Sequence, residues 1–233
     1  MAPVVEKDNM VGFDNEMKII KDRLFGGSEN LRVISIVGVI GVGKTTFANM
    51  VFNDREIEYE FFTRIWVYVS RACSRRQIFV YILSRFTSIR NDYHEMSDEN
   101  LAERIKEHLK GAKYLIVFDD VWTKEDWEQL KIAFPNNVKG SRILVTTRYQ
   151  NVASHIDSSG TPHELKGLSD DECWELLEKK IFGGERCPNS LESVGRSIAK
   201  KCNGVPLEVR KISGVLSQNR ILEDWSYLKR CMA

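Results

Sequence analysis

The chain has 233 residues, 42% apolar and 29% charged, which is enough for one ordinary domain or one domain with a small companion. Its 34 Lys and Arg residues against 33 Asp and Glu give a net charge of +1. Such a balance supplies no basic field for a phosphate backbone, so we expect no direct nucleic-acid partner. The five cysteines include no Cys-x-x-Cys pair and are odd in number, which excludes a zinc ribbon or a disulfide scaffold and favours reduced thiols inside a cell.

No segment predicts insertion into a membrane or secretion. The longest apolar stretch, residues 33–43, is about half as long as a bilayer-spanning helix. The first nine residues lack the basic flank and apolar core of a secretory signal. Because Met1, Ala2 and Pro3 resemble the start of an expression fragment, we expect a piece of a longer, intracellular protein.

Short β-rich apolar runs alternate with amphipathic stretches in the first part of the chain, which is typical of a parallel sheet covered by helices. Two of the runs are apolar on both faces, as expected for central strands between helix layers. The predicted strands are Val33–Val37, Arg64–Val69, Tyr114–Phe118 and Arg142–Thr146. The predicted fold class is therefore α/β, with a parallel sheet and helices on both faces.

The segment after the first strand, Gly38–Thr46, fits the P-loop pattern G-x-x-x-x-G-K-[ST] and leads into a helical run over residues 47–52. Its glycines let successive backbone N–H groups point at a phosphate, and the positive end of the following helix adds to the attraction. Lys44 would reach the β- and γ-phosphates, and the Thr45 hydroxyl would complete a Mg²⁺ shell. A dinucleotide fingerprint fails because Thr46 stands where its third glycine belongs.

Capping signals locate three helices. Ser97 precedes apolar residues at helical spacing, and Gly111 follows where a left-handed residue is wanted. Thr123 and Ser169 each have an acidic residue three positions on, which is the capping-box arrangement. Gly183 would end the helix that Ser169 opens.

Two carboxylates, Asp119 and Asp120, follow the predicted strand Tyr114–Phe118. In open α/β sheets ligands bind at the carboxyl ends of the strands. Asp119 would hold Mg²⁺, directly or through water, and Asp120 would face the γ-phosphate as a candidate base or water-orienting group. Paired acids at a strand end are also compatible with solvated turn residues.

The next predicted strand leads into two hydroxyls and a guanidinium at residues 146–148. These groups can report the presence of a γ-phosphate, which makes Arg148 a candidate sensor. The alternative is a surface arginine paired with a helix carboxylate. Guanine binding lacks support because Asp119 is not followed by x-x-Gly, and the tetrad-like segment Thr123–Asp126 opens a helix instead.

Strands give way to helices after about residue 160. The predicted helices are Asp170–Phe182, about Leu191–Cys202 and about Leu207–Ser217, and the turn-rich stretch Asp157–Pro162 is the candidate surface hinge. We therefore expect residues 1–160 to form a P-loop nucleotide-binding domain and residues 161–233 a small helical subdomain.

Six ordered motifs resemble those of the NB-ARC module of plant intracellular NLR immune receptors. They are the adenine-side motif Met10–Glu16, the second-strand motif Phe62–Ser70, the Walker B segment Lys113–Trp122, the sensor strand Gly140–Arg148, the linker His163–Ser169 and the GLPL motif Cys202–Leu207. Within them, Trp122 is typical of coiled-coil-type receptors, and the style of Glu58–Phe62 resembles solanaceous helper receptors.

The resemblance implies a STAND/ASCE-type P-loop NTPase that works as a switch, with ADP bound at rest and ATP with Mg²⁺ bound when active, and that controls defence and hypersensitive cell death. It carries nucleotide-binding roles over to Val11, Gly12 and Phe13 at the adenine, to Gly41, Val42, Gly43, Lys44, Thr45 and Thr46 at the phosphates, and to Pro206 and Leu207 as a cap on the base or ribose.

The same resemblance implies partners and a location. The partners are the remaining domains of a parent receptor and, beyond them, sensor receptors or pathogen effectors. The parent is expected in the cytoplasm, with oligomerisation and a move to the plasma membrane on activation. The fragment itself is expected to be a monomer.

Three features depart from the family pattern. Val39 and Ile40 occupy variable P-loop positions, which leaves the glycines and Lys44 intact. The helix after Pro206–Leu207 has gained a charged face, made of Glu208, Arg210 and Lys211. We interpret it as a normally buried face that has been made soluble, naturally or by engineering. The apolar side of the same helix consists of Leu207, Val209, Ile212, Val215 and Leu216. The sequence ends at Ala233, before the winged-helix subdomain with its Met-His-Asp motif and the leucine-rich repeats, so we expect weaker nucleotide binding than in the intact module and no switching by the fragment alone.

Two other functions stay open. One is a P-loop ATPase whose turnover is its function, although Asp120 is one methylene shorter than the Glu of efficient ATPases, which predicts slow hydrolysis. The other is a fragment that docks partners or pathogen inhibitors through the long loop Ile89–Asp98, which contains Tyr93 and His94.

The remaining histidines and tryptophans are interpreted as structural. The histidines His94, His108, His155 and His163 show no metal-ligand spacing. Cys202 is predicted to pack as a small apolar residue, and the predicted core anchors are Trp66, Trp127, Trp174 and Trp225.

Overall fold

The computed structural model describes residues 11–26, 30–87, 93, 95–136, 140–157 and 160–232. These residues fall into two compact units. The sheet unit contains residues 17–38 and 44–164, and the helical unit contains residues 11–16, 39–43 and 165–232, within the described ranges.

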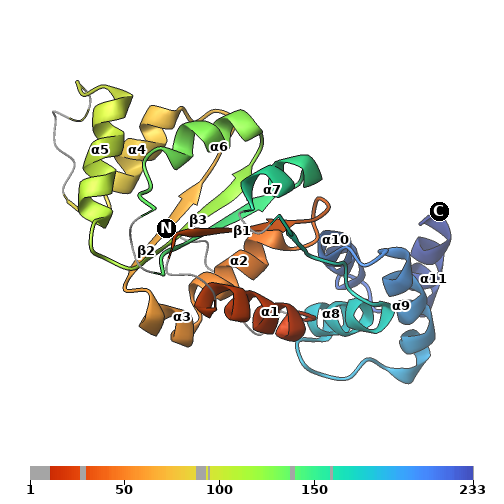
Figure 1. Ribbon diagram of the computed structural model, residues 1–233. Coiled ribbons are helices and arrows are strands. Elements are labelled where there is room, and N and C mark those ends of the chain that lie inside the picture. The colour runs from red at the N-terminus through yellow and green to blue at the C-terminus, as the bar shows by residue number, and fades with distance from the viewer. Residues whose placement is uncertain are drawn as a thin grey trace. The chain divides into compact units, whose positions relative to one another are not determined.

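The sheet unit is built on five parallel strands in the spatial order β2-β3-β4-β1-β5 (Figure 1). Four strands match the predicted ones to within three residues at each end, and the two-residue strand β5 was not predicted. Their bounds are β1 Arg32–Val37, β2 Thr63–Tyr68, β3 Tyr114–Val121, β4 Arg142–Thr147 and β5 His163–Glu164. The α/β class is thus confirmed, and β3, which lies between β2 and β4, is buried along its whole length.

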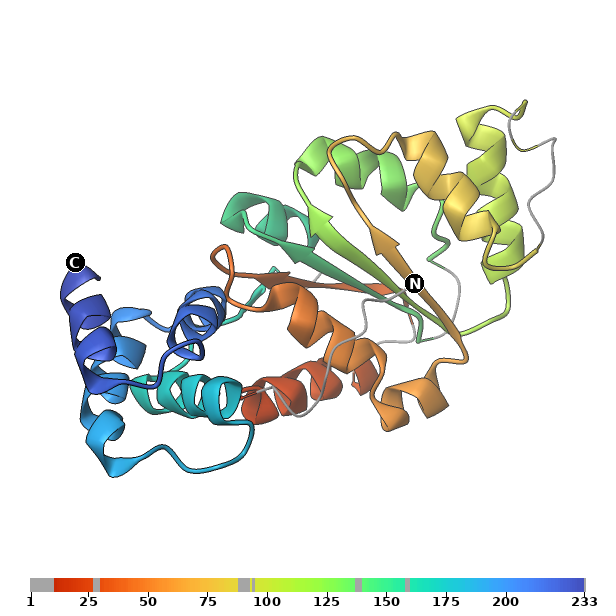
Figure 2. The same ribbon diagram turned by 180° about the vertical axis from the view of Figure 1, so that it is seen from behind.

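Helices cover both faces of this sheet, as Figure 2 shows from behind. Helices α4 to α7 share one large apolar core with β2, β3 and β4, in which Phe118 meets Trp127 and Phe134 edge to face. Helices α2 and α3 lie on the other side. The bounds are α1 Asp14–Phe25, α2 Lys44–Phe52, α3 Arg55–Glu60, α4 Arg75–Leu83, α5 Asp98–Leu109, α6 Lys124–Lys131 and α7 Gln150–Ile156.

The predicted caps are confirmed by hydrogen bonds. The side chains of Ser97, Thr123 and Ser169 each accept a backbone N–H three residues on, and the boxes at Thr123 and Ser169 are reciprocal. Gly111 and Gly183 have φ angles of 81° and 64°, the left-handed conformation that glycine adopts without strain.

Strand β3 extends three residues beyond its predicted end at Phe118. The pairing with β4 shifts register between Phe118 and Val121, and Asp120 has a φ of 65°. The predicted end was therefore wrong, because a bulge lets the strand run through both acids and resume its pairing at Val121.

Two single residues within the predicted surface loops are buried. Asp157, placed in a surface hinge, is 5% exposed and accepts hydrogen bonds from Arg23 at 2.8 Å and from the backbone and hydroxyl of Ser35 at 2.9 and 3.2 Å. Asp157 is buried because its carboxylate accepts the backbone N–H of Ser35, a residue of β1. Tyr93, placed in a docking loop, is 4% exposed and belongs to the apolar core of the sheet unit, while His94 lies outside the described residues.

The helical unit consists of helices around a second apolar core. The bounds are α8 Asp170–Phe182, α9 Asn189–Lys201, α10 Pro206–Leu216 and α11 Leu222–Cys231. Trp174, Trp225 and Cys202 are buried in this core as predicted, and Trp66 and Trp127 are buried in the sheet unit. Helix α10 buries Val209 and Leu216, but Val215 is 55% exposed, so its apolar side is narrower than predicted.

Among the helices of the described part of the chain, none combines the length and the apolar character that spanning a membrane requires.

Candidate functional site

The two carboxylates at the end of β3 have different surroundings. Asp119 is 0% exposed and accepts from the Thr45 hydroxyl at 2.9 and 3.0 Å and from the Thr146 hydroxyl at 2.6 Å. Thr45 lies in the first turn of α2, and Thr146 lies in β4. The sheet unit therefore brings together the two residues that the sequence proposed as magnesium ligands, and adds a third side chain.

The surroundings of Asp119 suit a hard cation. Its side-chain hydrogen bonds come from the neutral hydroxyls of Thr45 and Thr146, and burial raises the pKa of this carboxyl above its ordinary value while the two threonines oppose the shift. A carboxylate and a hydroxyl oxygen are ligands that Mg²⁺ prefers, and Mg²⁺ keeps several waters or phosphate oxygens as its other ligands. Within the described ranges no group of three or more His, Cys, Asp or Glu side chains could hold a metal by itself.

Lys44 begins α2 and is 8% exposed. Its ammonium group donates to the Gly38 carbonyl at 2.8 Å. Burial lowers the pKa of Lys44, and the positive charge of Arg148 lowers it further. A buried ammonium beside a second cation favours an anionic ligand, because an anion would offset both charges.

The Asp120 side chain pairs with Arg148. The Arg148 Nε and Nη2 atoms donate to the two Asp120 carboxylate oxygens, each at 3.1 Å, which is a bidentate pair. The Asp120 backbone N–H donates to the Thr146 hydroxyl at 2.8 Å, which stabilises the left-handed conformation at this residue. Thr146 thus holds both acids of the bulge at once.

Sequence reasoning did not assign three groups around this pair. Thr146 was read only as a hydroxyl near a phosphate, Trp122 only as a family marker, and Arg71 not at all. The guanidinium carbons of Arg71 and Arg148 lie 4.0 and 4.7 Å from the centroid of the Trp122 ring. No local sequence pattern predicts these ring contacts, because Arg71, Trp122 and Arg148 follow three different strands.

The other predicted nucleotide-binding residues, except Thr46, belong to the helical unit. The Leu207 N–H donates to the Gly41 carbonyl at 3.2 Å, and a Cβ on Gly41 would lie 2.8 Å from the Leu207 Cβ. A Cβ on Gly43 would lie 3.1 Å from the Phe13 ring. Gly41 and Gly43 have φ angles of 80° and 106°, so the loop needs glycine for both space and conformation. Of the remaining predicted residues, Val11 packs against the helical core, Gly12 is exposed with a φ of 83°, Val42 is buried and Pro206 begins α10, whereas Thr46 is half-buried in the sheet unit.

The described histidines have structural contacts. His155 lies 2.9 Å from a carboxylate oxygen of Glu128, His108 stacks on Phe86, and buried His163 stacks on Phe47.

Comparisons with known proteins give this geometry a context. Residues 13–187 match the NB-ARC domain. A putative disease resistance protein of Arabidopsis thaliana is 35% identical over 230 residues, which is 96% of this chain and 27% of that protein. A putative late blight resistance protein homolog, R1B-12 of Solanum demissum, is 35% identical over 219 residues, which is 94% of this chain and 16% of that protein. The chain thus spans only a minor part of the length of these relatives.

A solved structure supports the fold. A signal transduction ATPase with numerous domains, a STAND protein with a tetratricopeptide repeat sensor from Pyrococcus horikoshii, is similar with a TM-score of 0.61 at 20% identity, over 100% of this chain and 33% of that one. At that identity the likeness concerns the fold alone. The match over residues 13–187 decides the family: this chain belongs to the NB-ARC domain family and is a nucleotide-binding module of the type found in plant disease resistance proteins.

Proposed function

We propose that this chain is the regulatory switch module of a plant disease resistance protein, with ADP bound at rest and ATP bound in the active form. In the parent protein the exchange of ADP for ATP would release defence signalling and hypersensitive cell death. Residues 1–160 are proposed as the nucleotide-binding domain and residues 161–233 as a helical subdomain.

The bidentate pair between Arg148 and Asp120 carries the proposal. It ties the guanidinium that could read a γ-phosphate to the carboxylate that could activate water. A terminal phosphate offers the same guanidinium a more highly charged partner. The pair therefore favours reading the nucleotide over rapid turnover, because both oxygens of the Asp120 carboxylate already accept hydrogen bonds from Arg148.

Three groups of the sheet unit have the chemistry that an ATP–Mg²⁺ complex needs. Lys44 would neutralise the phosphates, and the Thr45 hydroxyl with the Asp119 carboxylate would hold Mg²⁺ directly or through water. Bound Mg²⁺ would supply charge neutralisation at the phosphate oxygens. The residues carried over by family resemblance, Val11–Phe13, Gly41–Gly43 and Pro206–Leu207, are proposed to bind the adenosine and phosphate parts of the same ligand.

The relatives support further proposals for the parent protein. Its remaining domains are the proposed partners of this module, together with sensor receptors or pathogen effectors. Assembly of the parent on activation, and its cytoplasmic location with a move to the plasma membrane, are proposals of the same kind.

The test is to denature the purified chain, identify the released nucleotide by chromatography, and titrate nucleotide-free protein calorimetrically with ADP, ATP and GTP in Mg²⁺. We expect ADP on the purified protein and binding of adenine nucleotides only. Lys44→Ala should weaken binding by about a hundredfold, since it removes the buried phosphate cation. Lys18→Ala, on an exposed side chain of α1, is the matched control.

Two results would contradict the proposal. Folded protein that binds neither ADP nor ATP has no nucleotide switch. Fast multiple-turnover phosphate release that Lys44→Ala abolishes would favour the turnover ATPase instead.

A further inference from the structure

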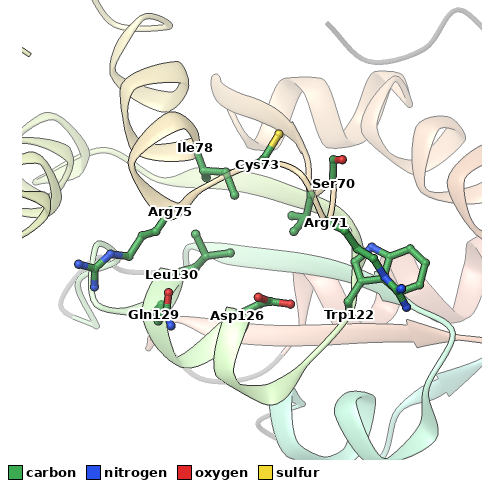
Figure 3. Close-up of a pocket in the computed structure, with 10 residues that line it drawn as sticks. Ser70, Arg71, Cys73, Arg75, Ile78, Trp122, Asp126, Gln129 and Leu130 are labelled. Atoms are coloured by element: carbon green, nitrogen blue, oxygen red, sulfur yellow. The ribbon is translucent and has the colours of Figure 1, made fainter. Parts of the chain in front are cut away.

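One aromatic ring in the sheet unit contacts two guanidinium groups. Arg71 and Arg148 place their guanidinium carbons 4.0 and 4.7 Å from the Trp122 ring centroid. The three residues follow β2, β3 and β4, which are neighbours in the sheet. Figure 3 shows the Arg71 side chain overlying the indole ring at one end of a polar pocket. Three adjacent strands thus each supply one member of a stack at their carboxyl ends.

The stack restricts Arg148. A guanidinium group donates hydrogen bonds only in its own plane, and a ring against its face fixes that plane. In this plane the Nε and Nη2 edge meets Asp120 with two bonds of equal length, 3.1 Å. Arg148 keeps 33% of its side chain exposed, so packing alone does not immobilise it. The Trp122 ring therefore restrains the direction in which Arg148 donates, in addition to the pair with Asp120.

The ring itself is held by stacking contacts. Its indole Nε1 is buried and has no hydrogen-bond partner within the described part of the chain, although a buried indole N–H ordinarily finds one. Tyr149 lies against the ring, with centroids 6.1 Å apart. The position of the indole thus provides contacts with Arg71, Arg148 and Tyr149 but leaves its N–H without an acceptor among the described residues.

The turn that carries Arg71 is tied to the same strand end. The Val69 N–H donates to the Asp119 carbonyl at 2.9 Å, and the turn closes through the Cys73 N–H to the Ser70 carbonyl at 2.9 Å. Arg71 is exposed, and among the described side chains no carboxylate forms an ion pair with it. Its guanidinium charge therefore serves the ring contact and adds positive potential beside Arg148.

We propose that Trp122 and Arg71 are positioning residues for the γ-phosphate sensor Arg148. Trp122 fixes the plane of the Arg148 guanidinium, and Arg71 holds the ring from the β2 turn. Arg148 then exchanges the Asp120 carboxylate for the terminal phosphate of ATP while its plane stays fixed. This inference rests on the adenine-nucleotide binding proposed above and names the residues that set the preference for ATP over ADP.

The experiment compares the affinities of ADP and of the slowly hydrolysed analogue ATPγS by calorimetry in Mg²⁺, on the whole chain. Trp122→Leu should weaken ATPγS by about tenfold and leave ADP within about twofold, because only the triphosphate draws on Arg148. Trp122→Phe should restore most of the loss, since it keeps an aromatic face. Arg71→Met should weaken ATPγS by about threefold, and Arg71→Lys by less. Arg85→Met removes another exposed arginine of the sheet unit and should change neither affinity.

The outcomes separate this inference from the proposed function. Wild-type protein that binds neither nucleotide overturns both. Wild-type protein that binds both, with an unchanged ratio of ATPγS to ADP affinity in Trp122→Leu or an equal loss for both ligands, overturns only the positioning role. Should Trp122→Leu fail to fold, the Arg71 variants decide: a ratio that matches Arg85→Met overturns the inference.

Discussion

Strand β4 begins with one arginine and is followed by another, and the two side chains have opposite environments. Arg148, just after the strand, is 33% exposed and donates to the carboxylate of Asp120. Arg142, the first residue of the strand, is 2% exposed, and its donors meet only backbone carbonyls among the described residues, at distances between 2.9 and 3.3 Å. The four carbonyls belong to Leu24, Gly26, Asn30 and Ser141.

The two arginines differ in whether a ligand can replace their hydrogen-bond partners. The carbonyls around Arg142 are fixed by the chain, and burial lowers the pKa of Arg142 without offering it a ligand. The carboxylate of Asp120 is a single anion at the carboxyl end of the inner strand β3, and a phosphate group can take its place. A buried arginine that saturates carbonyls therefore stabilises the fold, whereas a half-exposed arginine paired with an anion can read a ligand.

The largest expected effect is on stability. Arg142→Met should lower the free energy of unfolding by about 3 kcal/mol, because four carbonyls each lose a donor and the loss falls at a buried site. Arg148→Met should cost about 1 kcal/mol or less, since its pair is partly exposed. Urea denaturation at pH 7 measures both.

Nucleotide binding should give the reverse order. Folded Arg142→Met should keep the ratio of ATP to ADP affinity, which Arg148→Met should lower. Equal stability losses in the two variants would contradict the distinction between them.

The next effect concerns the metal. Asp119→Asn should weaken ATP binding in Mg²⁺ by about ten- to a hundredfold and leave binding in EDTA nearly unchanged, because the amide loses the charge that holds the cation. Calorimetry in the two buffers measures this difference. Asp22→Asn, on an exposed side chain of α1, is the control. Equal losses in both buffers would show that Asp119 acts on the fold rather than on Mg²⁺.

The same substitution has a pH signature without nucleotide. Burial raises the pKa of Asp119 in the folded chain above its ordinary value of 3.8, so the folded state prefers the protonated acid. That preference is fully present below the unfolded-state pKa and is lost as the pH rises through the folded-state pKa. Thermal unfolding in EDTA should therefore find Asp119→Asn gaining stability relative to wild type as the pH rises above 4.

How much of the fold the sequence predicts depends on the range of the interaction. The caps at Ser97, Thr123 and Ser169 and the P-loop pattern are local, so they predict their helices and the turn correctly. Helix α4 was not predicted although it opens with a capping box between Ser74 and Gln77, because two arginines precede its apolar residues. Helices α1, α3, α7 and α11 were missed too, since they lack a clear apolar period with caps on both sides.

The site shows the same limit. The motif order predicts Lys44 and the two acids, but the end of β3 depends on pairing with β4, which no local pattern encodes. The burial of Asp157 follows from contacts with Arg23 and Ser35, more than a hundred residues away. The Trp122 stack is non-local for the same reason, so only coordinates reveal it.

A smaller effect tests the bulge that separates the two acids. Thr146→Val should cost about 1–2 kcal/mol of unfolding free energy, because it removes a donor to Asp119 and the acceptor of the Asp120 N–H. Thr147→Val is the matched control: that side chain is equally buried, but its hydroxyl accepts only the Tyr149 N–H at 3.2 Å. Urea denaturation should rank Thr146→Val as the costlier change, and the opposite order would remove Thr146 from its role in the bulge.

The smallest effect sharpens the contrast between the arginines. Arg32 lies in register beside Arg142 across the β1–β4 pair and donates to the Gly26 carbonyl at 3.4 Å, a carbonyl that Arg142 already binds. Its charge also lowers the pKa of Arg142, so the two cations repel each other. Arg32→Met should therefore change the free energy of unfolding by less than about 0.5 kcal/mol, because the lost weak bond and the relieved repulsion offset each other. Urea denaturation of Arg32→Met and Arg142→Met side by side measures this difference. Comparable losses of stability in the two variants would mean that the two arginines act as one network, and the hydrogen bonding of these carbonyls could not be assigned to Arg142 alone.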